Sequence, residues 1–349
     1  MRIRVAVVLL ALIAGRTAAA GAQSRPERLF YYVDREDSYN DLVRHASQID
    51  VLSPSTYGVD EQGIVWGDVD PLVVDLARKN NIKLMPLIVN RPFNKDLLHQ
   101  FFSSPAARSR AISSMVELSK RNNFWGMQVD FENVSIEDRD ALTSWYQEAA
   151  IKMHQAGKTL SIAIVHRPED VAGVSQYHAW MMADWRGGYD LKALADAGDF
   201  ITVMTYSQHT RRTPPGPTAS LPWSTDVVNY FLRFMQPQKL SLGLGSGAMH
   251  WYTSQEDRIT PELARSYSDG YSYEWAQHVA QRNNAKWIWD DVQKMTYTYY
   301  PVGGTFEYIF LEDARNLAPK LDLVKQKNLR GTSMWVLGPE DPAIWNLLK

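Results

Sequence analysis

The sequence predicts a (β/α)8 TIM barrel with a small α+β insertion between its seventh and eighth strands. Eight β-rich segments recur along the chain, and each is followed by a segment with helical or helix-like spacing of its apolar residues. Strands that alternate with helices pair in parallel through right-handed crossovers, and eight such units close into a barrel. The stretch of about residues 251–310 is too long for a simple crossover, and it contains a helical pattern and β-rich pieces of its own.

Each element of this barrel has its own signal in the sequence. The expected strands are residues 29–33, 49–53, 82–89, 125–132, 159–165, 199–206, 239–245 and 329–337. The expected helices are residues 39–46, 70–80, 106–121, 135–157, 224–235 and 312–327. Asp70-Pro71 starts a helix, because Asp caps helices and Pro suits the first helical position. In the insertion we expect a helix at 273–283 and strands at 286–289, 296–300 and 305–310.

A doubly wound open sheet is the alternative arrangement of these elements. Its dinucleotide-binding form carries a G-x-G-x-x-G motif after the first strand, and the sequence has no such motif there. We find no internal repeat and no low-complexity linker. Residues 23–349 are therefore expected to form a single domain.

Composition excludes several functional classes. The 349-residue chain has 37 Lys and Arg against 39 Asp and Glu, so its net charge of −2 gives no basic field for nucleic acid. It has no Cys, which excludes disulfides, thiolate metal sites and a thiol nucleophile. Its 12 Trp suggest flat surfaces, used either for core packing or for binding flat ligands.

The first 22 residues have the pattern of a secretory signal peptide. Met1-Arg-Ile-Arg4 is basic, Val5 to Gly15 is an apolar run too short to cross a bilayer, and Ala20-Gly21-Ala22 fits a cleavage site. An uncleaved anchor is the alternative. We expect an exported mature chain that starts at Gln23, does not associate with membranes and is monomeric.

The fourth predicted strand carries two carboxylates on one face. Gln128, Asp130 and Glu132 share that face because side chains alternate along a strand, and the residues between them are apolar. In a barrel this polar face points inwards, and Glu132 lies at the carboxyl end of the strand, where barrel active sites are built. Buried like charges raise one pKa of the pair, as a general acid requires. A pair held by a buried Arg or Lys is the structural alternative. These residues alone predict a barrel hydrolase or lyase.

Four segments resemble a known family. Gly126-Met-Gln-Val-Asp-Phe-Glu132 resembles the DGxDxDxE strand of family-18 glycoside hydrolases, which include chitinases and endo-β-N-acetylglucosaminidases. Val203-Met-Thr-Tyr-Ser207 resembles the MTYD of the family's sixth strand, and Gly331 to Gly338 resembles the end of its eighth. Phe310 to Leu323 resembles a segment of the bacterial exported and spore-germination branch. The resemblance covers essentially the whole mature chain.

The resemblance implies a retaining mechanism assisted by the substrate, in which the acetamido oxygen of an N-acetylglucosamine attacks its own anomeric carbon. Glu132 would protonate the leaving oxygen and later activate water, and Asp130 would orient the acetamido group and stabilise positive charge. Tyr206 would bond the acetamido oxygen, and Trp335 would stack beneath the sugar. The implied partner is an N-acetylglucosamine-containing polysaccharide of the peptidoglycan or chitin type, and no cofactor is implied.

The sequence departs from the family pattern at three positions. Trp125 and Gln128 stand where the strand usually has Asp, and Ser207 replaces the Asp of MTYD. Fewer neighbouring carboxylates predict a smaller rise in the pKa of Glu132. Hydrolysis remains the expected activity. The alternative is a catalytically weak or inactive chitinase-like protein that binds glycans on the same fold.

Further residues lie at or after the ends of predicted strands, where they would line the cleft. With Gln128, Ser207 and Trp335, the expected substrate-binding residues are Tyr31, Tyr57, Asn90, His209 and Trp251. His166 is expected to be a solvated loop residue. His209 and His250 have no carboxylate at ligand spacing, so we expect no metal site. Trp287 and Trp289 alternate along a strand of the insertion, which suits either a sugar platform or core packing.

Overall fold

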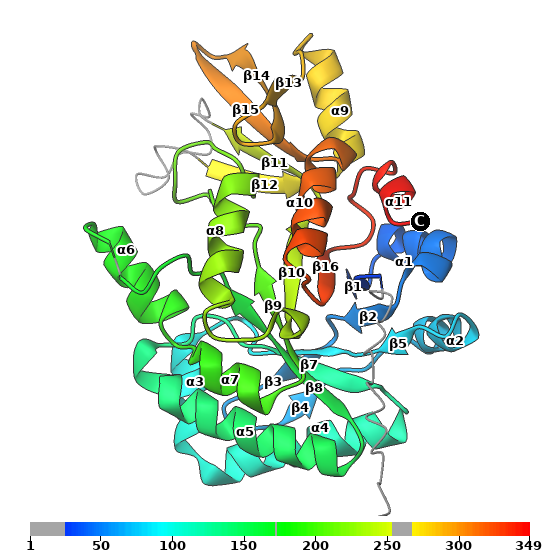
Figure 1. Ribbon diagram of the computed structural model, residues 1–349, viewed down its shortest axis with the longest axis vertical. Coiled ribbons are helices and arrows are strands. Elements are labelled where there is room, and N and C mark those ends of the chain that lie inside the picture. The colour runs from blue at the N-terminus through cyan, green and yellow to red at the C-terminus, as the bar shows by residue number, and fades with distance from the viewer. Residues whose placement is uncertain (1–24, 172, 253–266) are drawn as a thin grey trace, which may run out of the picture.

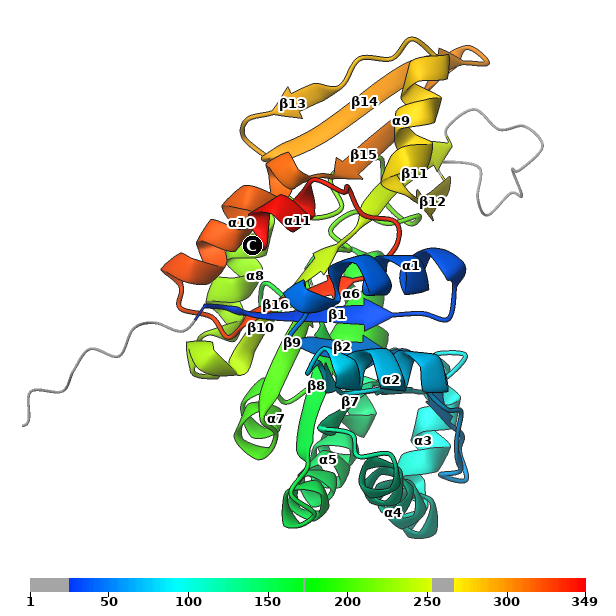
Figure 2. The ribbon, with the colours of Figure 1, turned by 90° about the vertical axis from the view of Figure 1, so that its right-hand side faces the viewer.

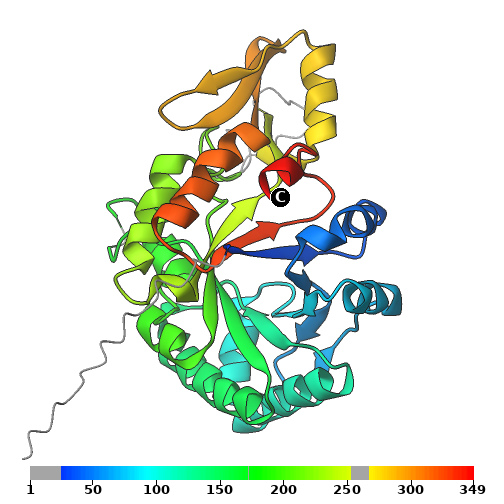
Figure 3. The same cartoon turned by 45° about the vertical axis from the view of Figure 1, so that its right-hand side comes forward.

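The computed structural model describes residues 25–171, 173–252 and 267–349, so the predicted signal peptide lies outside the described residues. The described chain forms a barrel of parallel strands surrounded by helices. A smaller antiparallel sheet projects from one end, at the top of Figure 1. Figures 2 and 3 show the helices on the outside of the barrel and the insertion beyond its rim.

The barrel strands run in the order β4-β3-β6-β7-β8-β9-β10-β16-β1-β2-β5. Their bounds are β1 (Glu27–Tyr32), β2 (Val51–Pro54), β3 (Tyr57–Val59), β4 (Val65–Trp66), β5 (Lys83–Leu84), β6 (Leu87–Val89), β7 (Gly126–Asp130), β8 (Thr159–Val165), β9 (Phe200–Met204), β10 (Leu240–Gly245) and β16 (Gly331–Trp335). All neighbours are parallel except β3 and β4, which form an antiparallel pair.

The second and third barrel strands are each built from two pieces. β2 and β3 are separated by two residues, and so are β5 and β6. β2 pairs with β5, and β3 pairs with β6. Because the two pieces of each strand pair in this way, the sheet closes into a barrel at these breaks. The break in the third strand falls at Pro86, which has no N–H to donate to a neighbouring strand. The eight predicted strands are therefore all present, and the TIM-barrel prediction is confirmed.

Helices surround the barrel, most of them on its outer face. Their bounds are α1 (Glu36–His45), α2 (Pro71–Lys79), α3 (Lys95–Ser103), α4 (Pro105–Arg121), α5 (Arg139–Gln155), α6 (Gln176–Met181), α7 (Leu191–Ala197), α8 (Leu221–Phe231), α10 (Ala314–Gln326) and α11 (Ile344–Leu347). The Asp70 side chain caps α2 by accepting the Leu72 N–H at 2.8 Å, as predicted. Among the helices of the described residues, none is long and apolar enough to span a membrane.

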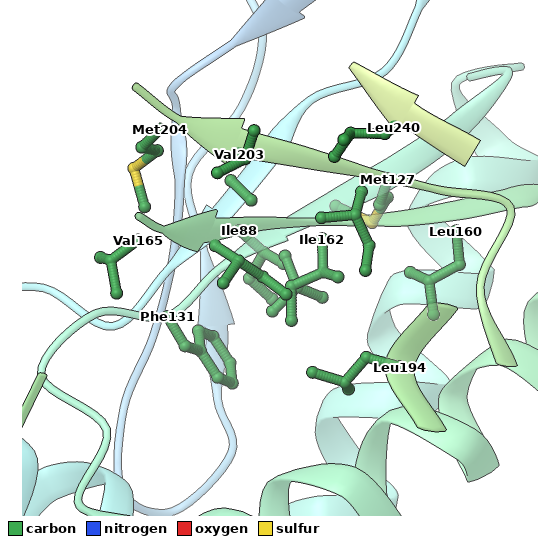
Figure 4. Packing of buried hydrophobic residues seen from close by; sticks show 14 of the residues in the cluster. Ile88, Met127, Phe131, Leu160, Ile162, Val165, Leu194, Val203, Met204 and Leu240 are labelled. Atoms are coloured by element: carbon green, nitrogen blue, oxygen red, sulfur yellow. The ribbon is translucent and has the colours of Figure 1, made fainter. Parts of the chain in front are cut away.

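Two apolar layers hold the barrel together. The outer layer lies between the strands and the helices, and Figure 4 shows part of it around Met127, Ile162 and Phe131. The inner layer fills the barrel itself with side chains such as Leu29, Met85 and Phe200, with Trp125 and Trp335 packed against it. Met127 and Val129 of β7 lie in the outer layer, so the apolar residues of this strand face the helices. Burial of this apolar surface is the main stabilising term of the fold.

The insertion is a five-stranded antiparallel sheet with one helix. Its strand order is β12-β11-β15-β14-β13. The bounds are β11 (Gly247–Tyr252), β12 (Tyr267–Tyr271), α9 (Tyr273–Arg282), β13 (Ile288–Asp290), β14 (Met295–Val302) and β15 (Thr305–Glu312). It begins at Gly247 rather than near 251, because only Ser246 separates β11 from barrel strand β10. The predicted α+β insertion is therefore present between the last two barrel strands.

Candidate active site

Asp130 and Glu132 lie together at the carboxyl end of β7. Asp130 is the last residue of the strand, Glu132 follows two residues later, and both line a cavity of about 440 Å³ at this end of the barrel. The strand starts at Gly126, where a Cβ would lie 2.1 Å from the backbone oxygen of Thr159 on β8. Gly126 therefore lets β7 and β8 approach closely, which sets the position of the carboxylates above it.

Burial changes the acidity of both carboxyl groups. Desolvation raises the pKa of Asp130 well above its usual value, and the nearby charge of Glu132 raises it further, while Arg91 lowers it. Desolvation also raises the pKa of Glu132, and a hydrogen bond from Trp185 lowers it in part. Two like charges in one apolar site favour a state in which the pair keeps a proton. A proton is therefore available at the cavity at higher pH than an exposed carboxyl group would allow.

The pair is not held by a buried cation. Within the described residues, no ion pair joins Asp130 or Glu132 to Lys or Arg, and Oδ1 of Asp130 is buried without a hydrogen-bond partner. Arg91 lines the same cavity, but its guanidinium donates to the backbone oxygen and hydroxyl of Ser55. The structural alternative for this pair therefore does not apply, and Asp130 keeps an acceptor that points into an apolar site.

Asn90 fixes the backbone of Glu132. The Asn90 side chain accepts the Glu132 N–H at 3.0 Å and donates to the Glu132 carbonyl at 2.9 Å, and it has no exposed surface. The prediction that Asn90 binds substrate is thus corrected: the Asn90 side chain holds the backbone of the loop after β7. Tyr189 donates to the carbonyl of Phe131 at 2.6 Å, so a second buried side chain fixes the same turn.

Trp185 and His166 also belong to this site, although neither was predicted from the sequence to lie in it. Trp185 Nε1 donates to Oε2 of Glu132 at 3.3 Å, and both Trp185 and His166 line the cavity. The prediction that His166 is solvated is wrong, because it is 1% exposed and packs edge-on against Trp185. Its Nε2 accepts from Arg186 at 2.7 Å, and burial lowers its pKa to about 3. His166 is therefore neutral and supports the indole that contacts Glu132.

Gln128 occupies a neutral network beneath the carboxylates. Its Oε1 accepts from the Tyr31 hydroxyl at 2.6 Å, and its Nε2 donates to Ser161 at 2.9 Å and Thr202 at 3.3 Å. The Thr202 hydroxyl continues to Ser333 at 3.0 Å. Gln128 is fully buried and does not line the cavity, so it supports the floor of the site rather than contacting substrate. Its amide has its donors and its acceptor satisfied, so the longer side chain fits without a buried charge.

Tyr206, Ser207 and Trp335 form one wall of the cavity. Tyr206 and Ser207 lie just beyond the end of β9, and Trp335 is the last residue of β16. Tyr31 from β1 also lines the cavity, with its ring 5.3 Å from that of Trp335. The structure therefore brings Tyr206, Ser207, Trp335 and Tyr31 to the same cavity as the carboxylates. An aromatic wall beside a carboxyl pair is an arrangement suited to a sugar ring.

Four other residues named from the sequence lie elsewhere. Tyr57 is 2% exposed and packs edge-on against Phe124 in the outer layer, and Trp251 is fully buried in the insertion beside Phe310, so neither contacts the cavity. His209 lies in the loop after β9, where its Nδ1 is 3.1 Å from the Pro214 carbonyl, and it does not line the cavity. Trp125 stacks on Phe200 in the inner layer, next to Lys83.

The cavity continues into a hollow on each side. One hollow, of about 480 Å³, shares Tyr206, Ser207 and Trp335 with the cavity and is bounded by the insertion. The other, of about 520 Å³, shares Phe93 and Trp185 with the cavity and is bounded by α6. The three spaces together form a groove across the carboxyl end of the barrel. In the described ranges, no group of His, Asp and Glu side chains has the arrangement to hold a metal ion.

Residues 28–340 match the glycosyl hydrolases family 18. The chain belongs to this family. The expected resemblance to the family-18 glycoside hydrolases is thereby confirmed. The match starts at the first barrel strand and ends beyond the last, so the family assignment rests on the whole barrel with its insertion.

The similar proteins include a bacterial glycosylase, spore cortex-lytic enzymes and a chitinase. The uncharacterized glycosylase YvbX of Bacillus subtilis is 23% identical, with 99% of this chain and 95% of the relative covered. The cortical fragment-lytic enzyme of Bacillus subtilis is 27% identical over 78% of this chain, and 61% of its own length is spanned. A chitinase from Chromobacterium violaceum shares the fold at a TM-score of 0.81 and 23% identity, with 93% of this chain and 98% of that chain covered. The Bacillus cereus spore cortex-lytic enzyme SleL has a TM-score of 0.82 at 20% identity, covering 94% and 74% of the two chains.

Proposed function

We propose that the protein hydrolyses β-linked N-acetylglucosamine-containing glycans with retention of configuration and assistance from the substrate. The buried Asp130–Glu132 pair at the groove carries this proposal. Its raised pKa values supply a carboxylic acid, and its position at the carboxyl end of β7 faces the groove. A general acid is effective when its pKa lies near the working pH.

The reaction proceeds in two steps. The acetamido oxygen of the bound sugar attacks its own anomeric carbon while the glycosidic C–O bond breaks, and Glu132 gives its proton to the leaving oxygen. Asp130 orients the acetamido N–H and stabilises the positive charge of the resulting oxazolinium ion, and Tyr206 donates its hydroxyl hydrogen to the acetamido oxygen. The Glu132 carboxylate then removes a proton from water, which attacks the anomeric carbon and restores the acetamido group. The two displacements give net retention.

Gln128 and Ser207 favour one alternative function, a glycan-binding protein without turnover on the same fold. They remove two carboxylates that the family pattern places near the acetamido group. Against this, Gln128 lies below the cavity in a satisfied network, and Asp130 retains the acceptor that the acetamido group requires. Hydrolysis is therefore the better-supported activity.

The Glu132→Gln variant separates these functions. We expect the wild-type protein to release new reducing ends from peptidoglycan or chitin oligomers, and the variant to lose about 10²- to 10⁴-fold in rate while still binding the same oligomers. Gln keeps the shape of the side chain but has no acidic proton. If wild type and variant bind equally and neither cleaves, the protein is a glycan-binding protein. If neither protein binds the oligomers, the groove is not a glycan-binding site.

We further propose that the chain is exported after cleavage near Ala22 and acts as a monomer. The basic, apolar and small-residue segments of the first 22 residues support export. Mass spectrometry of the exported protein checks whether its first residue is Gln23, and light scattering checks for a single-chain mass. A retained leader or a dimer would contradict this proposal.

A further inference from the structure

The hollow beside α6 differs in chemistry from the rest of the groove. We call it the leaving-side hollow and define it by Lys95, Tyr177, Trp180, Asp184, Arg211 and Arg212, which line its space of about 520 Å³. Side chains from three separate segments meet here: the start of α3, α6 with the π-helical turn Met182–Arg186, and the loop after β9. None of these six residues belongs to the motif that identifies the family.

This hollow lies on the side of Glu132 from which the leaving group departs. Asn133, the residue after Glu132, lines it, and so does Trp185, whose indole donates to the Glu132 carboxyl at 3.3 Å. Tyr206 and Trp335, which would hold the acetamido sugar, line the cavity and the opposite hollow but not this one. A sugar that receives the proton of Glu132 would therefore extend into the leaving-side hollow.

Two cations of the leaving-side hollow have no acidic partner. Lys95 is paired with Asp184 at 3.2 Å, whereas neither Arg211 nor Arg212 forms an ion pair with a carboxylate of the described residues. The guanidinium carbon of Arg212 lies 4.5 Å from the centre of the Trp180 ring. The remaining acid, Asp96, lies in the first turn of α3, where the helix dipole favours its negative charge.

The opposite hollow, next to the insertion, shows no such excess of positive charge. Its Arg35 is paired with Asp37 at 3.0 Å, and its Glu312 is paired with Lys320 at 2.8 Å. Both acids and both bases are thus neutralised within the protein. The groove is therefore asymmetric, with a charge-balanced side for one end of the polymer and a cationic side for the other.

We propose that the leaving-side hollow binds a sugar that carries a carboxylate, so that the protein prefers an alternating, anionic amino-sugar polymer over a neutral one. Arg211 and Arg212 would pair with the acidic substituent of the leaving sugar, because guanidinium groups match carboxylates in geometry and charge. Trp180 and Tyr177, whose rings lie 6.1 Å apart, offer apolar faces to the ring of that sugar. This inference rests on the proposed function, because it takes the leaving side from the role of Glu132.

The test compares three ligands that differ in the charge of the leaving sugar. They are peptide-free glycan fragments that alternate N-acetylglucosamine and N-acetylmuramic acid with free carboxylates, the same fragments with their carboxylates amidated, and chitin oligomers of equal length. For the Arg211→Gln/Arg212→Gln variant we expect KM for the anionic fragments to rise about tenfold, since a charge-assisted contact is worth roughly that factor. KM for the amidated fragments and for chitin should stay within about twofold of the wild-type values, and kcat should be unchanged for all three ligands.

A double variant on the outer helices, Arg78→Gln/Lys192→Gln, removes the same net charge away from the groove and should change none of these values. Equal effects of the two double variants, or an equal loss on charged and neutral ligands, would overturn the inference. Binding of the three ligands to Glu132→Gln protein, measured by calorimetry, repeats the comparison without turnover. If wild type cleaves nothing, the proposed function fails, and the calorimetry still decides whether the arginines select the anionic ligand.

Discussion

A small set of neighbours fixes the position and the acidity of Glu132, and each contacts a different part of the residue. Asn90 holds its backbone through two hydrogen bonds, and Trp185 holds its carboxyl group through one. Desolvation raises its pKa, and the indole N–H lowers it by stabilising the charged form. The acidity of the proton donor is thus a balance between an apolar site and one directed hydrogen bond.

Removing that hydrogen bond should shift the pH profile in a defined direction. In Trp185→Phe the carboxylate loses a donor, so the pKa of Glu132 rises and the proton is retained to higher pH. We expect the basic limb of the kcat/KM profile to move to higher pH, with a loss of about tenfold or less in rate from poorer orientation. Trp66→Phe, on the outer strand β4, serves as the control. A basic limb that stays in place or moves to lower pH would show that Trp185 does not act on Glu132.

Gln128 departs from the family pattern, and the structure gives a physical reason why it is tolerated. A fully buried Asp at this position would bring a third charge next to Asp130, whereas the amide of Gln128 bonds to Tyr31, Ser161 and Thr202 as a neutral group. The substitution therefore changes the electrostatics of the site without leaving a polar atom unsatisfied.

The Gln128→Met variant tests this network. Met has nearly the same shape but no amide, so the Tyr31 hydroxyl loses its acceptor and two further hydroxyls lose a donor. We expect a loss of about 2–3 kcal/mol in the free energy of unfolding, measured by denaturant titration. Gln100→Met, on the exposed face of α3, should change stability by less than about 0.5 kcal/mol. A similar small change for Gln128→Met would mean that the network contributes little.

At the scale of elements, one buried ion pair joins the insertion to the barrel's outer helices. Glu312 ends β15 and accepts from Asn316 at 2.9 Å and from Lys320 at 2.8 Å, both on α10, and from the Thr218 hydroxyl. Glu312 is 8% exposed and Lys320 is 1% exposed. The side chain also borders the groove, so this cluster positions one wall of the opposite hollow.

Lys320→Met would leave the Glu312 carboxylate buried without a cation. We expect this variant to lose about 3–5 kcal/mol of stability, because an uncompensated buried charge costs more than a missing pair. The double variant Lys320→Met/Glu312→Gln should recover a large part of that loss, and thermal unfolding of both proteins checks it. A double variant that is no more stable than the single one would contradict this explanation.

Helices and strands were predicted correctly where the apolar residues have a strong periodicity. They were missed where tertiary contacts determine the local structure. The barrel strands have continuous β-rich runs, and capped helices such as α2 have clear start signals. α3 was not assigned, although Leu98, Phe101 and Phe102 have helical spacing that could have indicated it. Residues 176–186 show no comparable pattern, so α6 and the π-helical turn that carries Trp185 could not be placed from the sequence.

Individual site residues were likewise predicted correctly only where a sequence motif fixed their position on the strand. The alternation in β7 placed Gln128, Asp130 and Glu132 on one face, because one motif specified the register. Tyr57 and Trp251 had no such motif, and a shift of one residue along a strand moves a side chain to the opposite face. Both belong to apolar packing that only the folded chain reveals.

Across the whole molecule, the barrel and the insertion produce a groove with different chemistry at its two ends. The carboxyl pair lies at its centre, paired charges lie toward the insertion, and guanidinium groups without an acidic partner among the described residues lie toward α6. A groove open on both sides of the proton donor accommodates a polymer rather than a single small sugar.

The most direct test of the central claim is product analysis of wild-type protein on peptidoglycan and chitin oligomers in parallel, with the first-formed anomer followed by NMR. We predict new N-acetylglucosamine reducing ends that appear first as the β anomer, and none with Glu132→Gln. Cleavage that first gives the α anomer would contradict assistance by the substrate. Release of no product from either polymer would contradict hydrolysis itself.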